Sequence, residues 1–298
     1  MCGVAGLFAG CAALYFCPAG ARRGRVGAAG ADGGAGADGG ARADDGAGGT
    51  EYRSPFAHWF DNATVRVAQR RELSGADDGL FLFSPELVPI AGHPLIRSLP
   101  PQQFREVLIR HAYRYLDYTA RLEQLVVNRT VAGIAHGTVH VDVPEEMRFD
   151  AYKIYCDEAY HALFSADLIR QIRARTAVAP VLSGIPWFLR RLDELKAEAG
   201  PQRAALVELL FVICSETLIS ATLAEVPDDA RVAPAVRQQV RDHARDEGRH
   251  HAYFAAFLPR LWSGLDPRQR RFTAQVVPEL LRAFLEPDLD AVRAELAG

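Results

Sequence analysis

Apolar residues from position 100 onward recur at intervals of three and four, which is the spacing of one buried face of an α-helix. The first segment with this spacing covers residues 101–135 and has a proline at its first helical position. A second segment begins at a proline and covers residues 144–175, and a shorter one covers residues 186–199. The pattern therefore predicts three successive helices in this part of the chain.

The helical pattern continues toward the C-terminus. Residues 202–225 are apolar on nearly all sides, which predicts a buried helix. A long helix is predicted over residues 231–258, where Pro259 and the following Gly264-Leu-Asp-Pro267 should end it, and one or two further helices follow. Residues 51–100 mix aromatic residues with Pro and Gly, which favours short helices and packed loops. Because no alternation of period two appears after residue 100, we predict an all-α helical bundle with additional helices at both ends.

The composition and charge of the chain limit the kinds of partner and the cellular location that we expect for the protein. The chain has 298 residues, of which 49% are hydrophobic, and this is ample for one large core. A formal net charge of −3 argues against nucleic acid or an anionic membrane as an electrostatic partner. The five cysteines form no regular framework, so we predict a reducing, cytoplasmic location rather than a disulfide scaffold.

The first 50 residues differ in character from the rest. Residues 1–20 are apolar, as in a secretory signal peptide. A signal peptide has basic residues before its apolar segment, however, and here no Lys or Arg precedes it. Residues 27–50 are rich in Gly, Ala and Asp and carry too little apolar surface to fold. We predict a disordered leader over residues 1–50 and a helical domain over residues 51–298.

The phrase Asp-Glu-x-x-His occurs twice, at residues 157–161 and 246–250. A glutamate and a histidine three residues apart lie on the same face of a helix. Two such helices can together offer two carboxylates and two imidazoles to a pair of metal ions. Sites of this kind are completed by one glutamate from each of two further helices, so the sequence should contain two more inward-facing glutamates.

The two intervening helices each contain one suitable glutamate. Glu216 lies in a run that is otherwise uncharged, and a buried carboxylate is costly unless it is paired or bound to metal. Glu123 is flanked by Arg121 and Gln124, so on its own it is equally compatible with an exposed surface. His243 precedes Glu247 by four residues and therefore shares its helix face. The predicted metal ligands are Glu123, Glu158, His161, Glu216, His243, Glu247 and His250.

Two aspartates accompany these predicted ligands. Asp157 and Asp246 each precede a ligand histidine by four residues, where they could accept the second N–H of that imidazole. Ordinary solvated aspartates are an equally good interpretation. His251 points about 100° away from the site, by the rotation of one helical residue. Carboxylates and imidazoles without thiolate favour iron or manganese over a structural zinc ion.

The order and spacing of these residues resemble the p-aminobenzoate N-oxygenase family of diiron proteins, which belong to the ferritin-like superfamily. The resemblance covers residues 100–260, and the third histidine, His243, separates that family from most ferritin-like diiron enzymes. It implies two iron ions, O₂ as co-substrate, and oxidation of an amino group to hydroxylamine, nitroso or nitro in secondary metabolism. It also implies electrons from an external donor or reductase, and no catalytic side chain other than the metal ligands.

The identity of the substrate stays open at this level. An arylamine acid, an aliphatic amine, an amino acid and a carrier-bound aminoacyl group all fit the implied chemistry. Tyr115 could bind a polar group of the substrate, although a helix tyrosine is more often part of the core. Further candidate pocket walls are Tyr155, Thr217, Ser220 and Phe254.

Two other functions fit the same ligand set. One is a ferritin-like iron-binding protein or ferroxidase, and the other is a diiron C–H hydroxylase or desaturase. A bundle of this size is also compatible with a homodimer, for which the sequence offers no interface signal.

Overall fold

The computed structural model describes residues 52–139, 141–182, 184–223 and 229–297, so the predicted leader lies outside the described residues. Residues 59–97 form only short helices, as predicted from their Pro and Gly content. These elements are α2 (Trp59–Asn62), α3 (Thr64–Val67), η1 (Gly75–Asp77), η2 (Pro85–Leu87), η3 (Pro89–Gly92) and α4 (Pro94–Arg97).

The long helices follow from Pro101 onward. They are α5 (Pro101–Leu122), η4 (Glu123–Val127), α6 (Asn128–Ala135), α7 (Glu145–Arg175), α8 (Trp187–Ala199), α9 (Pro201–Leu223), α10 (Pro234–Gly264), α11 (Pro267–Leu285) and α12 (Leu289–Ala297). Within the described ranges the only β-type pairing is an isolated bridge between Phe81 and Val232, and there is no strand. The predicted all-α class is confirmed.

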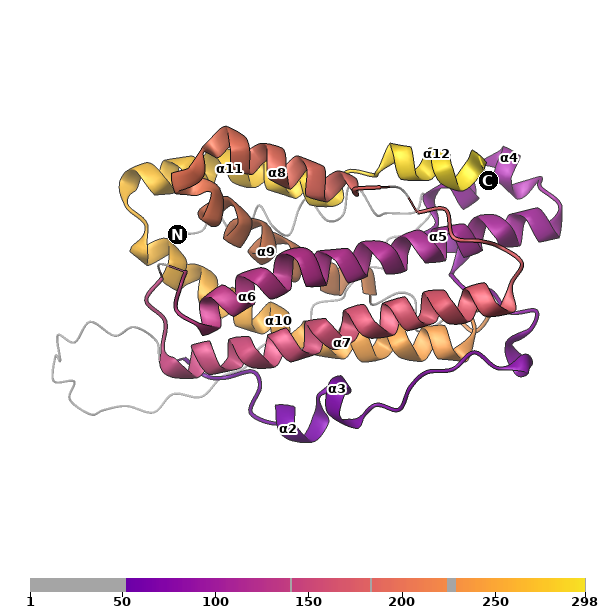
Figure 1. Ribbon diagram of the computed structural model, residues 1–298, viewed down its shortest axis with the longest axis horizontal. Helices are drawn as coiled ribbons and strands as arrows, with labels where there is room; N and C mark the ends of the chain where they lie inside the picture. Colours follow the sequence, from indigo (N-terminus) through magenta and orange to yellow (C-terminus); the bar gives the residue numbers. More distant parts are fainter. Residues whose placement is uncertain (1–51, 140, 183, 224–228, 298) are drawn as a thin grey trace, which may run out of the picture. The chain divides into compact units, whose positions relative to one another are not determined.

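In the unit Ser54–Gly298, the segment α5–η4–α6 and the helices α7, α9 and α10 pack around a common axis (Figure 1). α7 runs back along α5 and α6, and it also contacts α10, which packs against α9. α9 closes the circle through its contacts with α6 and η4. α8 and α11 pack on α9, α12 packs on α5, and α3 touches both α7 and α10. The axis is therefore enclosed by α5, η4, α6, α7, α9 and α10, with the other helices packed outside them.

The predicted helix over residues 101–135 is interrupted by a π-helical turn, η4 (Glu123–Val127). The interval of apolar residues does not reveal this turn, because only the local backbone pairing changes. Short π-helical turns inside α-helices are rare, and those that do occur are often found at functional sites. Here the turn begins at a predicted metal ligand, Glu123.

Pro259 does not end α10, which continues to Gly264, so that boundary prediction was wrong. A proline inside a helix removes one backbone hydrogen bond and costs about 3 kcal/mol. Phe257 and Leu261 lie on either side of Pro259 and are both buried in the core. Their packing against the neighbouring helices offsets the backbone cost and holds the last turn in place.

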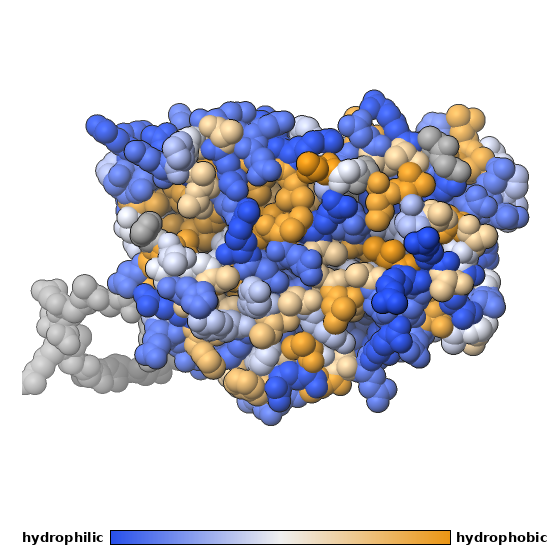
Figure 2. All heavy atoms as spheres, in the orientation of Figure 1, coloured by the Kyte–Doolittle hydropathy of each residue, from blue (hydrophilic) through white to orange (hydrophobic). Residues whose placement is uncertain are grey.

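The apolar character of α9 has the predicted consequence, because all eight residues of 209–216 are buried. On the face drawn in Figure 2, hydrophilic and hydrophobic residues are interspersed over the helices. None of the described helices combines the length and the continuous apolarity needed to cross a bilayer.

Replacing Phe257 by alanine should destabilise the fold by about 3–5 kcal/mol, because it removes a fully buried aromatic ring and leaves a cavity. Urea unfolding followed by circular dichroism measures this change. The control is Leu163→Ala, since Leu163 is 61% exposed and its loss should change stability by no more than about 0.5 kcal/mol. Equal effects of the two substitutions would contradict the described core.

Candidate metal centre

The seven predicted ligands converge from four helical segments. Glu123 opens η4, Glu158 and His161 come from α7, Glu216 comes from α9, and the remaining three come from α10. Every one of these residues is buried, with at most 2% of its surface exposed. Seven ionisable groups in one dry volume are costly unless opposite charges or metal ions compensate them.

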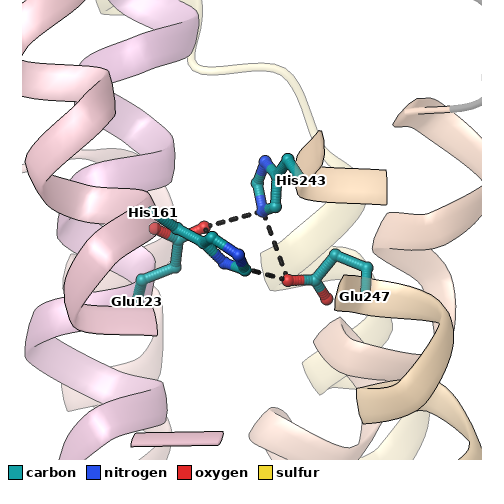
Figure 3. A group of neighbouring side chains, drawn as sticks. All are labelled: Glu123, His161, His243 and Glu247. Carbon is teal, nitrogen blue, oxygen red and sulfur yellow. Dashed lines mark ion pairs between the residues drawn. The ribbon is translucent and has the colours of Figure 1, made fainter. Parts of the chain in front are cut away.

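The ligand atoms fall into two overlapping groups, and within each group they all lie within 4.8 Å of one another. We call them position A (Glu123, His161, His243 and Glu247) and position B (Glu158, Glu216, Glu247 and His250). Figure 3 shows position A, where Glu123 and His161 face His243 and Glu247 across the space between the helices. Glu247 belongs to both positions, so it lies where a carboxylate would be shared by two ions.

Glu158 also lies between the two positions. Its Oε2 is 3.5 Å from His161 Nδ1 in position A, and its Oε1 is 2.9 Å from His250 Nδ1 in position B. One oxygen therefore faces each position. Glu247 Oε1 lies 3.2 Å from His243 Nε2 and 3.3 Å from His250 Nδ1. Two carboxylates thus separate the groups in the way that bridging carboxylates separate two metal ions.

The inward-facing atoms fit metal ions better than they fit one another. Eight buried nitrogen and oxygen atoms of the predicted ligands make no hydrogen bond of standard geometry among the described residues, although several lie within ion-pairing distance of one another. They are both oxygens of Glu123 and of Glu158, one oxygen of Glu216, Nδ1 of His161 and of His250, and Nε2 of His243. A buried polar atom without a partner costs about 1–3 kcal/mol. Lone pairs that converge on one point can instead be satisfied by a cation.

Burial raises the pKa of two of the four clustered glutamates, whereas the neighbouring histidines hold the pKa of Glu158 and of Glu247 below the usual value. Burial raises the pKa of Glu123 to about 7, although His243 attracts its charged form. Burial also raises the pKa of Glu216 well above its usual value, and the charges of Glu247 and Glu158 add to this effect. Four ionised glutamates with neutral imidazoles carry a charge of −4, which two divalent cations balance.

The pKa values of two ligand histidines are shifted in the direction that favours the protonated imidazole. Burial by itself lowers the pKa of His161 and of His250, but the surrounding carboxylates raise both well above the usual value. The carboxylates therefore favour a positive charge at this point of the cluster. A bound metal ion would take over that charge, because it needs the deprotonated imidazole nitrogen as its ligand.

The two aspartates contact the histidines, but crosswise rather than within one helix as the sequence suggested. His161 Nε2 lies 3.1 Å from Asp246 Oδ2, and His250 Nε2 lies 3.3 Å from Asp157 Oδ2. With Nδ1 turned toward the metal positions, each imidazole points its Nε2 away from its own helix, toward the facing one. The predicted pairing by an interval of four residues was therefore wrong, while the contact of each aspartate with a ligand histidine is present.

Sequence reasoning missed three residues that hold these aspartates. Trp59 Nε1 donates to Asp157 at 2.9 Å from each carboxylate oxygen. Arg249 forms an ion pair with Asp246, and the backbone N–H of Thr64 donates to the same carboxylate at 3.5 Å. Trp59 and Thr64 lie in short helices that have no periodic signal, so only their tertiary contacts with the aspartates of α7 and α10 reveal them.

Asp157→Asn should lower the affinity for metal about 10–100-fold, because His250 would lose the carboxylate that orients its ring and raises its basicity. Competition with a chelator measures the dissociation constant. Asp193→Asn is the control, since the Asp193 side chain is 75% exposed on α8. Unchanged affinity in the Asp157 variant would show that this contact does not support a metal ligand.

Tyr115 lies beside position A. It lines a small cavity together with His243, Phe164 and Gln239, and the cavity volume of about 10 Å³ holds roughly one water molecule. Burial raises the pKa of the Tyr115 hydroxyl, and the nearby charges of Glu123 and Glu247 raise it further. The position predicted for this residue, facing a pocket next to the metal ligands, is thus compatible with the structure.

The other candidate pocket walls lie elsewhere or have other roles. Tyr155 is 45% exposed and does not line this cavity. Phe254 packs with Tyr253 and Phe257 in the core, and the Thr217 hydroxyl donates to a backbone carbonyl of its own helix. The side chain of Ser220 lies outside the described residues. His251 is exposed and lies against the Thr217 carbonyl, outside both metal positions.

The fold and these contacts define a class of protein: a helical bundle with a buried cluster of carboxylates and imidazoles suited to two metal ions. The family model of the p-aminobenzoate N-oxygenase AurF matches residues 71–298, so the chain belongs to the p-aminobenzoate N-oxygenase family. The predicted resemblance is confirmed, and the match extends beyond residues 100–260 in both directions.

A curated relative provides a second comparison. The 4-aminobenzoate N-oxygenase of Streptomyces thioluteus is 27% identical over 215 residues. The matched region covers 71% of this chain and 63% of the relative. The chain thus spans less than two thirds of the length of that relative.

Proposed function

We propose that the seven clustered side chains hold two iron ions, and that the protein uses O₂ and two external electrons to oxidise the amino group of a small molecule. The observation that carries this proposal is the pair of overlapping ligand groups that share Glu247. The family and the relative support oxidation at nitrogen as the reaction. Carboxylate and imidazole donors suit iron, with manganese as the alternative metal.

Each ligand has a distinct place in this proposal. Glu123, His161 and His243 would hold the ion at position A, while Glu216 and His250 would hold the ion at position B. The remaining two, Glu158 and Glu247, would bridge the positions. When bound, the iron pair supplies the activation of O₂, which the side chains of this protein cannot perform.

The protein's own residues orient the ligands and exclude water. Asp157 and Asp246 fix which imidazole nitrogen faces the metal, because each accepts the other N–H of its histidine. The complete burial of the cluster keeps solvent away from a strongly oxidising site. These functions need no side chain to act as a nucleophile.

The overall reaction balances as RNH₂ + O₂ + 2 e⁻ + 2 H⁺ → RNHOH + H₂O. The two electrons would come from an external reductase or small donor. Oxidation beyond the hydroxylamine, to nitroso or nitro, would repeat the use of O₂. A role in secondary metabolism, a cytoplasmic location and a homodimer stay predictions from the sequence.

We place the amine near Tyr115 and His243, where a cavity borders position A. Its volume, about one water molecule, is too small for an arylamine, so the lining side chains must move to admit the substrate. Leu116, Phe164 and Leu168 make most of this lining apolar. Whether the amine is free or carrier-bound is decided by the test below.

The test incubates iron-loaded protein with a reductant, ¹⁸O₂ and a panel of free and carrier-bound amines, and identifies the products by mass spectrometry. We expect a hydroxylamine or a more oxidised nitrogen product that contains ¹⁸O. Mineralisation of iron without dependence on amine would indicate the ferroxidase alternative. A product hydroxylated or desaturated at carbon would indicate the C–H alternative, and either result would contradict the proposal.

A further inference from the structure

The two aspartates behind the metal positions have similar contacts with histidine but different charge environments. Both are completely buried, and each accepts an N–H from one ligand histidine. Asp246, behind His161, also forms an ion pair with the guanidinium of Arg249. Asp157, behind His250, accepts instead from the neutral indole of Trp59, which reaches both of its oxygens. Only one of the two carboxylates thus has a cation as a direct partner.

Lysine does not balance the charge of Asp157. Lys153 lies one helical turn earlier on α7, but its ammonium pairs with Asp150 at 2.8 Å. Its other contacts are the rings of Phe56, Phe60 and Phe149. Within the described part of the chain, no lysine or arginine reaches ion-pairing distance of Asp157.

The metal ligands of the two positions also differ, and they too make the surroundings of position B less positive than those of position A. Position A contains two imidazoles, from His161 and His243, whereas position B contains only the imidazole of His250. With Glu158 and Glu247 both counted as lying between the positions, Glu123 belongs to position A alone and Glu216 to position B alone. Counting the aspartates and their partners, the surroundings of position B are therefore more negative by one charge. A buried charge difference within a few ångströms acts strongly on a metal ion, because the local dielectric screening is weak.

Resting on the proposed dinuclear iron site, we infer that its two positions are not equivalent in redox behaviour. The iron ion at position A accepts the first electron, while the ion at position B stays ferric until the second. Arg249 and Trp59 are the positioning residues that set this difference, through Asp246 and Asp157. In each step one electron from an external reductant converts one ferric ion to ferrous, and no other group changes oxidation state.

One residue on the position B side, Trp59, comes from outside the segment that matches the family. Trp59 precedes residue 71, where the family match begins. Its indole is 6% exposed, packs edge-on against Phe60 at 5.2 Å, and lies 6.0 Å from the guanidinium carbon of Arg66. The segment formed by α2 and α3 therefore brings this N–H to the metal centre across the surface of α7.

The test is a reductive titration of the iron-loaded protein with dithionite, in which electron paramagnetic resonance follows the half-reduced centre. In Arg249→Gln, the first step should become harder, because Asp246 loses its balancing cation. The equilibrium constant that favours the half-reduced centre should fall roughly tenfold or more. Arg249→Lys keeps the positive charge and should restore it.

Two further variants act on the other position. Asp157→Asn removes the unbalanced charge and should make the second step easier, which also lowers the population of the half-reduced centre. Trp59→Phe leaves Asp157 without its neutral donor and should make the second step harder, which raises that population. Arg245→Gln is the matched control, since Arg245 pairs with Asp242 and its side chain is 50% exposed.

The outcomes separate the two proposals. If each variant binds two irons per chain and titrates like the wild-type protein, the inference is wrong and the proposed function stands. If Arg245→Gln changes the titration as much as Arg249→Gln does, the effect is one of general charge, which also overturns the inference. If the wild-type protein does not bind two irons, the proposed function fails and the inference fails with it.

Discussion

Glu247→Gln will prevent binding of the metal pair and reduce amine oxidation by more than the roughly 10–100-fold that is typical of changes beyond the ligands themselves. Glu247 is the only residue common to both ligand groups, and its Oε1 contacts histidines of both positions. Glutamine keeps the volume of the side chain but removes its negative charge and half of its acceptor capacity. Iron content by inductively coupled plasma mass spectrometry and product formation measure the two effects.

The control for this substitution is Glu279→Gln, because Glu279 lies on α11 and pairs with arginines at the surface. It should keep both the iron content and the activity of the wild-type protein. Circular dichroism should show that both variants remain helical. A Glu247 variant that retains two irons would contradict the assignment of this glutamate as the shared ligand.

His243→Ala is expected to empty position A of its iron and to lower amine oxidation at least about tenfold. The Nε2 of His243 lies 3.0 Å from Glu123 Oε1 and 3.2 Å from Glu247 Oε1, so its removal leaves position A with a single imidazole. The same preparation of protein serves for metal analysis and for kinetics.

His251→Ala is the matched control, since His251 lies on the same helix but is exposed and faces a backbone carbonyl. It should leave both measurements unchanged. If the His243 variant behaves like the His251 variant, the third histidine is not a ligand, and the assignment of position A is wrong.

The features that could be predicted from the sequence are those that depend on one helix at a time. The interval between Glu158 and His161 fixes their common face whatever surrounds them, because the helical repeat is local. Glu216 could be placed inside the bundle because its neighbours are uncharged and the whole helix is apolar. Such arguments need no knowledge of which helices are neighbours.

The features that could not be predicted depend on contacts between segments. The crosswise pairing of Asp157 with His250 follows from the side-by-side packing of α7 and α10. Trp59 is 98 positions from Asp157 in the sequence, in a segment without periodicity. The π-helical turn at Glu123 changes backbone pairing without changing the apolar pattern. These are the features that tune the site rather than define its ligands.

Contacts between segments also explain why α10 continues through Pro259. The local cost of proline predicts an end to the helix, and this cost is real. The buried side chains of Phe257 and Leu261, on either side of it, pack against the rest of the bundle, and that packing favours the helix. Tertiary packing thus overrides a local preference, as it does for intrinsic helix propensities.

The central claim is that one chain binds two iron ions in this cluster, and an anaerobic titration with Fe(II) tests it most directly. Unbound iron is removed after each addition, and bound iron is measured per chain. We expect tight binding that saturates at two irons per wild-type chain and is lost in Glu247→Gln. Saturation at one iron, or the same binding in the Glu247→Gln variant, would contradict the account.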